Sequence, residues 1–134
     1  MDLEIKGKKA LVLASSQGLG KAIAKELIQE GAETALCSRG GEKLQTAAKE
    51  IGASHSFTVD LYQPGAIVQL IEEAQSALGS IDILITNAGG PPAGSFDDLE
   101  IVQWQANYQS LFLSVVEGCQ AALPAMKELS LIHI

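Results

Sequence analysis

Short apolar runs alternate with longer segments of helical periodicity along most of this chain. Residues 10–13 form an unbroken apolar run, which is typical of a strand that is buried on both faces. In the segment that follows, Leu19, Ile23 and Leu27 recur at helical spacing, and Gly31 lies where a left-handed residue would end a helix. Strands and helices that alternate in this way predict βαβ units with right-handed crossovers, and therefore a parallel sheet.

The same pattern continues through the rest of the sequence. It predicts strands over residues 34–37, 54–59 and 81–85, and helices over residues 42–51 and 63–78. Gln63 opens the second of these helices with Pro64 in its first turn, and Gly52 and Gly79 end the two helices. A Gly- and Pro-rich loop follows at 87–94, and a last long helix runs from Asp97 or Asp98 to residue 123, ahead of Pro124. Four strands in the doubly wound order 3-2-1-4 give an α/β, Rossmann-type parallel sheet. We expect one domain over residues 1–128 and an atypical tail at 129–134.

The composition excludes several classes of function. Nine Lys and Arg residues against sixteen Asp and Glu residues give a formal net charge of −7, which disfavours a general nucleic-acid binder. No apolar run reaches the roughly 18 residues that a membrane span needs, and the first residues lack the order of a signal peptide. Two cysteines, Cys37 and Cys119, fit neither a disulfide framework nor a metal site. These features predict a cytoplasmic protein without metal, nucleic-acid or membrane partners.

The turn between the first strand and the first helix is the strongest candidate for a binding site. A strand that ends in a tight turn directs the free N–H groups of the helix start at one point, which favours a diphosphate. Gly18 would allow the backbone to approach the ligand, and Gly20 would allow close packing of helix and strand. Ala14 replaces the first glycine of the usual fingerprint, and its methyl group requires a negative φ. The alternative is a purely structural turn. The predicted cofactor-binding residues here are Ser15, Ser16, Gln17, Gly18, Leu19 and Gly20.

In dinucleotide-binding folds, the residue that recognises the group on the ribose 2′ position lies at the end of the second strand. The segment around Ser38 and Arg39 contains no Asp or Glu to accept a hydrogen bond from a free 2′-hydroxyl. Arg39 can instead pair with a 2′-phosphate, and Ser38 can donate a hydrogen bond to it. NADP is therefore favoured over NAD. The alternative is that Arg39 is a solvated loop residue.

Two further loops lie at the predicted carboxyl edge of the sheet. Asp60 and Leu61 follow the third strand, where the carboxylate would accept a hydrogen bond from an adenine amine or would cap the next helix. Asn87, Ala88 and Gly89 follow the fourth strand, and such small residues leave room for a flat cofactor.

Together these motifs resemble the N-terminal half of the short-chain dehydrogenase/reductase family, over about residues 6–127. Residues 13–20 are similar to that family's Thr-Gly-x-x-x-Gly-x-Gly turn, with Leu13 and Ala14 in place of the first two letters, and residues 87–89 match its Asn-Ala-Gly signature. Asp60 matches the aspartate that contacts adenine. Asn107 matches the asparagine that joins the catalytic tetrad through a water-linked proton relay, although an amide inside a helix can also simply bond to the backbone.

The resemblance implies an oxidoreductase that transfers hydride between NADP(H) and a small carbonyl or alcohol substrate, as 3-oxoacyl-[acyl-carrier-protein] reductases do. In that family a serine on the fifth strand and a Tyr-x-x-x-Lys pair complete the catalytic residues. Tyr62 and Tyr108 are followed four positions later by Ala66 and Phe112, and residues 129–134 lack a Gly-rich lead into a fifth strand. We therefore expect a sheet truncated before that strand and an incomplete, inactive fragment. The alternative is a non-catalytic dinucleotide-binding or interaction module.

The last helix carries an apolar stripe that is wider than one sheet face requires. The stripe is either buried by the rest of its own domain or covered by a partner subunit. We expect a homo-oligomer that forms through residues 98–123.

Overall fold

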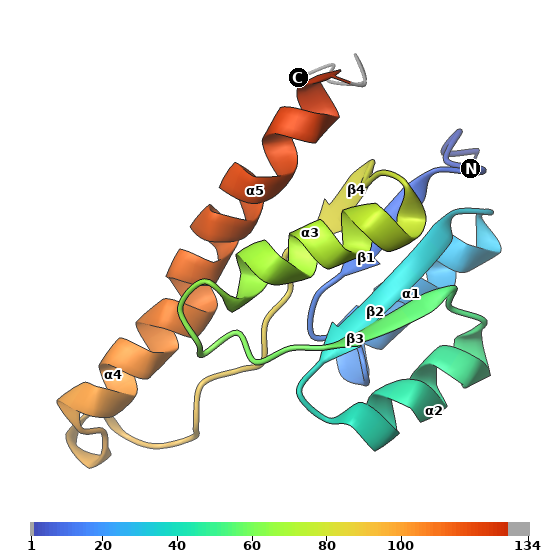
Figure 1. The fold of residues 1–134 in the computed structure, drawn as a ribbon. Helices are drawn as coiled ribbons and strands as arrows, with labels where there is room; N and C mark the ends of the chain where they lie inside the picture. The colour runs from blue at the N-terminus through green and yellow to red at the C-terminus, as the bar shows by residue number, and fades with distance from the viewer. Residues whose placement is uncertain (1, 129–134) are drawn as a thin grey trace.

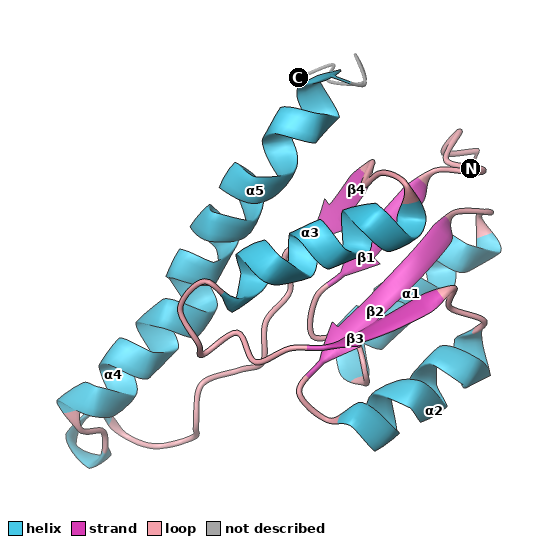
Figure 2. Ribbon diagram, viewed as in Figure 1, coloured by secondary structure: helices cyan, strands magenta, loops and turns pink. Residues whose placement is uncertain are grey.

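In the computed structural model, which describes residues 2–128, a four-stranded parallel sheet has helices on both faces (Figures 1 and 2). The strands are β1 (Lys9–Val12), β2 (Glu33–Ser38), β3 (His55–Thr58) and β4 (Ile83–Ile85), and their order is β3-β2-β1-β4. The helices are α1 (Gly18–Gln29), α2 (Gly41–Ile51), α3 (Ala66–Leu78), α4 (Ile101–Tyr108) and α5 (Ser114–Glu128). This confirms the predicted α/β, Rossmann-type fold and its strand order. The predicted tail at 129–134 lies outside the described residues.

The central strand explains why its sequence is apolar without interruption. In β1, Leu11 faces a core cluster that includes α3 and Ala122 of α5, whereas Val12 faces a second cluster with α1 and α2. Both side chains are fully buried, because successive residues of a strand point to opposite faces and both faces of this sheet are covered. β1 pairs with β2 and β4 in parallel, so the ends of all these strands reach the same edge of the sheet.

Left-handed glycines end the first three helices as predicted. Gly31, Gly52 and Gly79 have φ values of 90°, 78° and 86°, which a residue with a side chain rarely adopts. The fourth strand is shorter than predicted and begins at Ile83. Just before it, the Asp82 N–H donates to the Lys9 carbonyl at 2.8 Å, and the Asp82 carboxylate accepts the Lys9 N–H at 2.7 Å.

The prediction that Pro64 lies in the first turn of the third helix was wrong. The helix begins at Ala66, and Gly65 before it adopts a left-handed conformation with φ 78°. This residue breaks the helical path between Pro64 and α3, so residues 61–65 form turns instead.

The last helix also differs from the prediction in its continuity and its end. A 3₁₀ turn (η1, Phe96–Asp98) precedes α4, and a π-helical turn (η2, Gln109–Leu113) joins α4 to α5. α5 runs through Pro124 to Glu128, so the predicted end at residue 123 was wrong. Proline removes one helical hydrogen bond, but continuation of the helix packs Met126 against the core cluster that contains Ala122. Packing therefore outweighs the local preference.

Within residues 2–128, no helix combines the length and the apolar character needed to cross a membrane.

Candidate functional site

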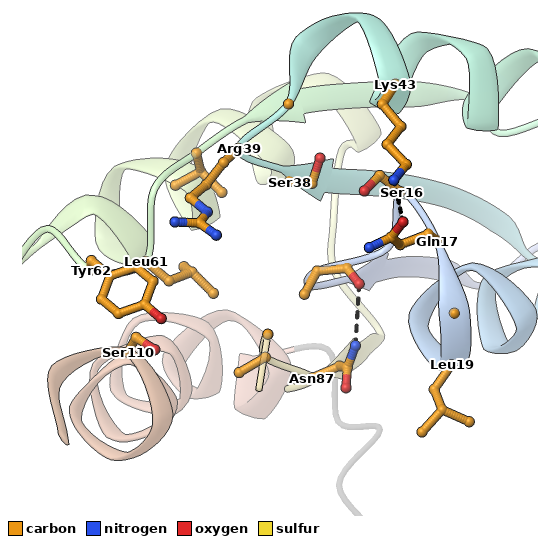
Figure 3. A pocket seen from close by; sticks show the side chains of 16 residues that line it. Ser16, Gln17, Leu19, Ser38, Arg39, Lys43, Leu61, Tyr62, Asn87 and Ser110 are labelled. Carbon is orange, nitrogen blue, oxygen red and sulfur yellow. Dashed lines mark hydrogen bonds between the residues drawn. The ribbon is translucent and has the colours of Figure 1, made fainter. Parts of the chain in front are cut away.

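The carboxyl ends of all four strands open onto one cavity of about 450 Å³ (Figure 3). Each of the four loops that follow the strands contributes to its wall, and the π-helical turn η2 adds Ser110. Ligands of doubly wound sheets bind at this edge. The cavity is lined by these predicted cofactor residues: Ser16, Gln17, Gly18, Leu19, Ser38, Arg39, Leu61, Asn87, Ala88 and Gly89.

The glycine turn is held in place by a close contact between helix and strand. A Cβ atom on Gly20 would lie 2.4 Å from the carbonyl oxygen of Ala14 and 2.9 Å from Nδ2 of Asn87, so only glycine fits there. Asn87 donates a hydrogen bond from Nδ2 to that same Ala14 oxygen at 3.2 Å, which ties the loop after β4 to the turn after β1. Gly18 has φ 57° and space around its Cα, as expected of a backbone that faces a ligand.

The expectation of a negative φ at Ala14 was wrong. Its φ is 48°, in the left-handed region that glycine occupies without strain. The turn therefore keeps the conformation that a glycine would give it. Hydrogen bonds hold it there: the Ser15 Oγ donates to the Val12 carbonyl, and the Asn87 Nδ2 donates to the Ala14 carbonyl.

Ser15 does not line the cavity. Its side chain is fully buried, and its Oγ donates to the carbonyl of Val12 at 2.7 Å and accepts the N–H of Cys37 at 3.1 Å. Its own N–H donates to the carbonyl of Cys37 at 2.9 Å, so that group is already engaged. Ser15 therefore joins β1 to β2 beneath the turn.

Three side chains give the cavity a positively charged corner beside the end of β2. The Arg39 guanidinium lies over the ring of Tyr62, with Cζ 5.2 Å from its centre, and Lys43 donates a hydrogen bond from Nζ to the side-chain oxygen of Gln17. The hydroxyl oxygen of Ser38 is buried and has no hydrogen-bond partner among residues 2–128. Of the described residues that line the cavity, none is an Asp or a Glu. In a chain of net charge −7, this corner is suited to an anion.

Asp60 lies next to the cavity and not in its wall. Its Oδ1 accepts the N–H of Tyr62 at 3.0 Å, which closes a turn, and it lines a smaller neighbouring cavity. It does not cap α3 as the alternative from sequence expected, because the N-cap residue of that helix is Gly65. The contact of Asp60 with adenine remains a prediction. Leu61 and Tyr62 line the main cavity instead.

Asn107 lies near the end of α4, one turn before Ser110. Its Nδ2 donates to the carbonyl of Gln103 at 2.8 Å, and its Oδ1 accepts the Tyr62 hydroxyl at a long 3.5 Å. The first bond is the backbone contact expected of a helix-interior amide, and the π-helical turn begins two residues later. The catalytic role of Asn107 remains a prediction.

Sequence reasoning missed Lys43, Tyr62 and Ser110. Lys43 could have been found from the sequence, because it lies four residues after Arg39 in the first turn of the helix that follows β2. Tyr62 and Ser110 carry no such signal, since only the folded chain brings β3's loop and η2 to the same wall.

Cys37 is not a nucleophile at this site. Burial raises the pKa of its thiol from 9.0 to about 12, against the opposing effect of a backbone hydrogen bond from Ala14. A thiol with this pKa stays protonated at neutral pH.

The last helix packs on its domain through small side chains and leaves much of its apolar stripe exposed. Small residues four apart are buried, namely Ser110, Ser114, Gly118 and Ala122, and Gly118 comes close to Ile67 of α3. Large apolar side chains of α4 and η2 are exposed, including Ile101 at 73% and Phe112 at 53%. Association of two copies through residues 98–123 remains a prediction.

Comparison with known proteins identifies the family of this chain. The family model described as short chain dehydrogenase matches residues 8–131. The chain belongs to the short-chain dehydrogenase family. An uncharacterized oxidoreductase of Staphylococcus aureus is 33% identical over 129 residues, which cover 95% of this chain and 56% of that protein. The chain spans about half the length of the curated relatives it matches.

Several solved structures superpose closely on this chain. L-Sorbose reductase from Gluconobacter frateurii, complexed with NADPH and L-sorbose, is 30% identical with a TM-score of 0.88, over 96% of this chain and 51% of that one. The 3-oxoacyl (acyl-carrier-protein) reductase of Agrobacterium tumefaciens C58, with NADP bound, is 30% identical with a TM-score of 0.84, over 91% and 48%.

Proposed function

We propose that this chain is the NADP(H)-binding half of a short-chain dehydrogenase that interconverts a carbonyl and an alcohol. The observation that carries the proposal is the corner formed by Ser38 and Arg39. It combines a guanidinium with a buried hydroxyl that has no hydrogen-bond partner among residues 2–128, and none of the described residues that line the cavity is an Asp or a Glu. A 2′-phosphate supplies the acceptor oxygens and the negative charge that these groups need.

The other cavity residues fit the remainder of the dinucleotide. The N–H groups at the start of α1, together with Gly18, would hold the diphosphate, and Leu61 would pack on the adenine. Ala88 and Gly89 leave a flat wall for the nicotinamide end. NADPH, when bound, supplies the hydride, and the protein orients it and excludes water. Asn107 is proposed as a member of the proton relay, held in orientation by its bond to the Gln103 carbonyl.

The substrate class is inferred from relatives only. A solved relative acts on L-sorbose and another is named a 3-oxoacyl reductase, so a small carbonyl compound or a 3-oxoacyl thioester is proposed. A cytoplasmic location is likewise a proposal.

Titration of NADPH and NADH into the purified chain tests the cofactor proposal. We expect tighter binding of NADPH, and a 10- to 100-fold loss of NADPH affinity in Arg39→Asp, because a charged hydrogen bond contributes about 1.5–3 kcal/mol. Affinity for NADH should stay the same or rise, since the aspartate can accept the 2′-hydroxyl. Equal binding of the two cofactors, with no effect of the substitution, would refute the assignment.

A second candidate is a non-catalytic dinucleotide-binding module. Within these 134 residues, neither Tyr62 nor Tyr108 is followed by a lysine four residues later, as a Tyr-x-x-x-Lys pair requires. Both candidates predict cofactor binding and negligible turnover by these 134 residues alone. The two are separated by the longer coding sequence: a Tyr-x-x-x-Lys segment in the same frame supports the enzyme. Oxidation of NADPH by the pure chain with an acetoacetyl thioester would contradict the prediction of negligible turnover.

A further inference from the structure

We propose that Lys43 is a second specificity-determining residue, which binds the 2′-phosphate of NADP(H) opposite Arg39. This inference rests on the proposed function. It assigns the discrimination against NAD(H) to two cations on different elements, Arg39 in the loop after β2 and Lys43 in the first turn of α2.

The present partner of Lys43 is neutral and easily exchanged. Its Nζ donates to the amide oxygen of Gln17, in the glycine turn. By contrast, Lys9 and Lys21 are paired with the carboxylates of Glu33 and Glu50. A phosphate dianion can draw a lysine away from an amide oxygen, because the phosphate is charged and the amide is neutral. It competes less well with a carboxylate, which is also negatively charged.

The placement of Lys43 lets it reach the same phosphate as Arg39 from another direction. In Figure 3 the Ser38 side chain lies between Arg39 and Lys43, and the amine of Lys43 lies beside Ser16 and Gln17. Arg39 is held against the Tyr62 ring, whereas Lys43 extends from the first turn of α2 toward the glycine turn. A phosphate that satisfies the Ser38 hydroxyl would therefore be flanked by both cations.

The surrounding charges leave this pair uncompensated. Glu42 precedes Lys43 in the helix but is exposed and does not line the cavity. Glu50 is on the same helix and pairs with Lys21. Gly40, Gln17 and Ser38 line the cavity on this side and are all neutral.

The test measures affinities for NADP⁺ and NAD⁺ in Lys43→Met, with Lys49→Met as the matched control. Lys49 lies in the last turn of the same helix, is exposed, and does not line the cavity, so its loss removes the same charge away from the site. We expect Lys43→Met to weaken NADP⁺ binding about tenfold, which corresponds to about 1.4 kcal/mol. NAD⁺ binding should change by less than about twofold. Lys43→Arg should restore most of the NADP⁺ affinity.

Each other outcome overturns the inference in a distinct way. An equal loss of both cofactors in Lys43→Met would place the lysine at the diphosphate. Unchanged NADP⁺ binding in Lys43→Met, or the same loss in Lys49→Met, would show that the lysine has no local role. In these cases the wild-type chain still prefers NADP⁺, so the proposed function stands. Failure of the wild-type chain to bind NADP⁺, or a preference for NAD⁺, removes the proposed function and this inference together.

Discussion

Substitution of Gly20 by alanine tests whether the close contact between α1 and β1 shapes the binding turn. Gly20 is buried in the first turn of α1, against the backbone that leaves β1. The added methyl group would lie 2.4 Å from the Ala14 carbonyl oxygen and 2.9 Å from the Ser15 Cα. Both neighbours are backbone atoms, so neither can rotate away.

The expected cost follows from these distances. The contact must open by about 1 Å to become an ordinary one, and overpacking of this kind costs about 1–3 kcal/mol. The same movement weakens the hydrogen bond from Asn87 to Ala14, which contributes about 1 kcal/mol. A total loss of about 2–4 kcal/mol is a large part of a typical margin of about 5–15 kcal/mol.

Thermal and urea unfolding measure this loss, with Gly90→Ala as the control. A Cβ atom on Gly90 meets nothing within 4 Å, so the same chemical change there should be nearly neutral. We expect Gly20→Ala to lower Tm by about 10 °C and to weaken NADPH binding, because the turn is displaced. If Gly20→Ala unfolds within about 2 °C of Gly90→Ala and binds NADPH like the wild type, the steric argument fails.

Three further predictions concern residues around the same turn. Ala14→Gly should stabilise the chain by about 0.5 kcal/mol in urea unfolding, because relief of the left-handed strain exceeds the added entropy of the unfolded state; a destabilised variant would contradict this. Since burial raises the pKa of Cys37 to about 12, its contribution to stability is complete below pH 9 and is lost as the pH rises toward 12. At pH 10 the wild type should lose about 1.4 kcal/mol more than Cys37→Ala, and identical pH profiles would exclude this effect. Tyr62→Leu should weaken NADPH about two- to fivefold by releasing Arg39, while Tyr62→Phe should not; equal losses would assign the effect to the hydroxyl.

Much of the fold was predictable because the signals are local. The alternation of apolar runs with helical stripes identified all four strands, and glycines marked the ends of α1, α2 and α3. Gly20 was assigned to close packing from its position in the motif, and the structure places it there. One error fell where tertiary packing overrides a local preference. At Pro124 the helix continues, because Met126 packs on the core beyond it.

The sequence by itself determined the parallel sheet, which follows from periodicity and from the handedness of βαβ crossovers. It also predicted the strand order and the edge at which the cavity lies, through the doubly wound pattern of such sheets. Only the tertiary structure decided which side chains share the cavity. It placed Ser15 and Asp60 in the framework, and it brought Lys43 and Tyr62 into the wall. It also buried the small residues of the last helix and exposed the large ones, because close approach to α3 requires small side chains at that contact. Spacing along a chain cannot specify such contacts, which depend on the distances between elements after they have packed.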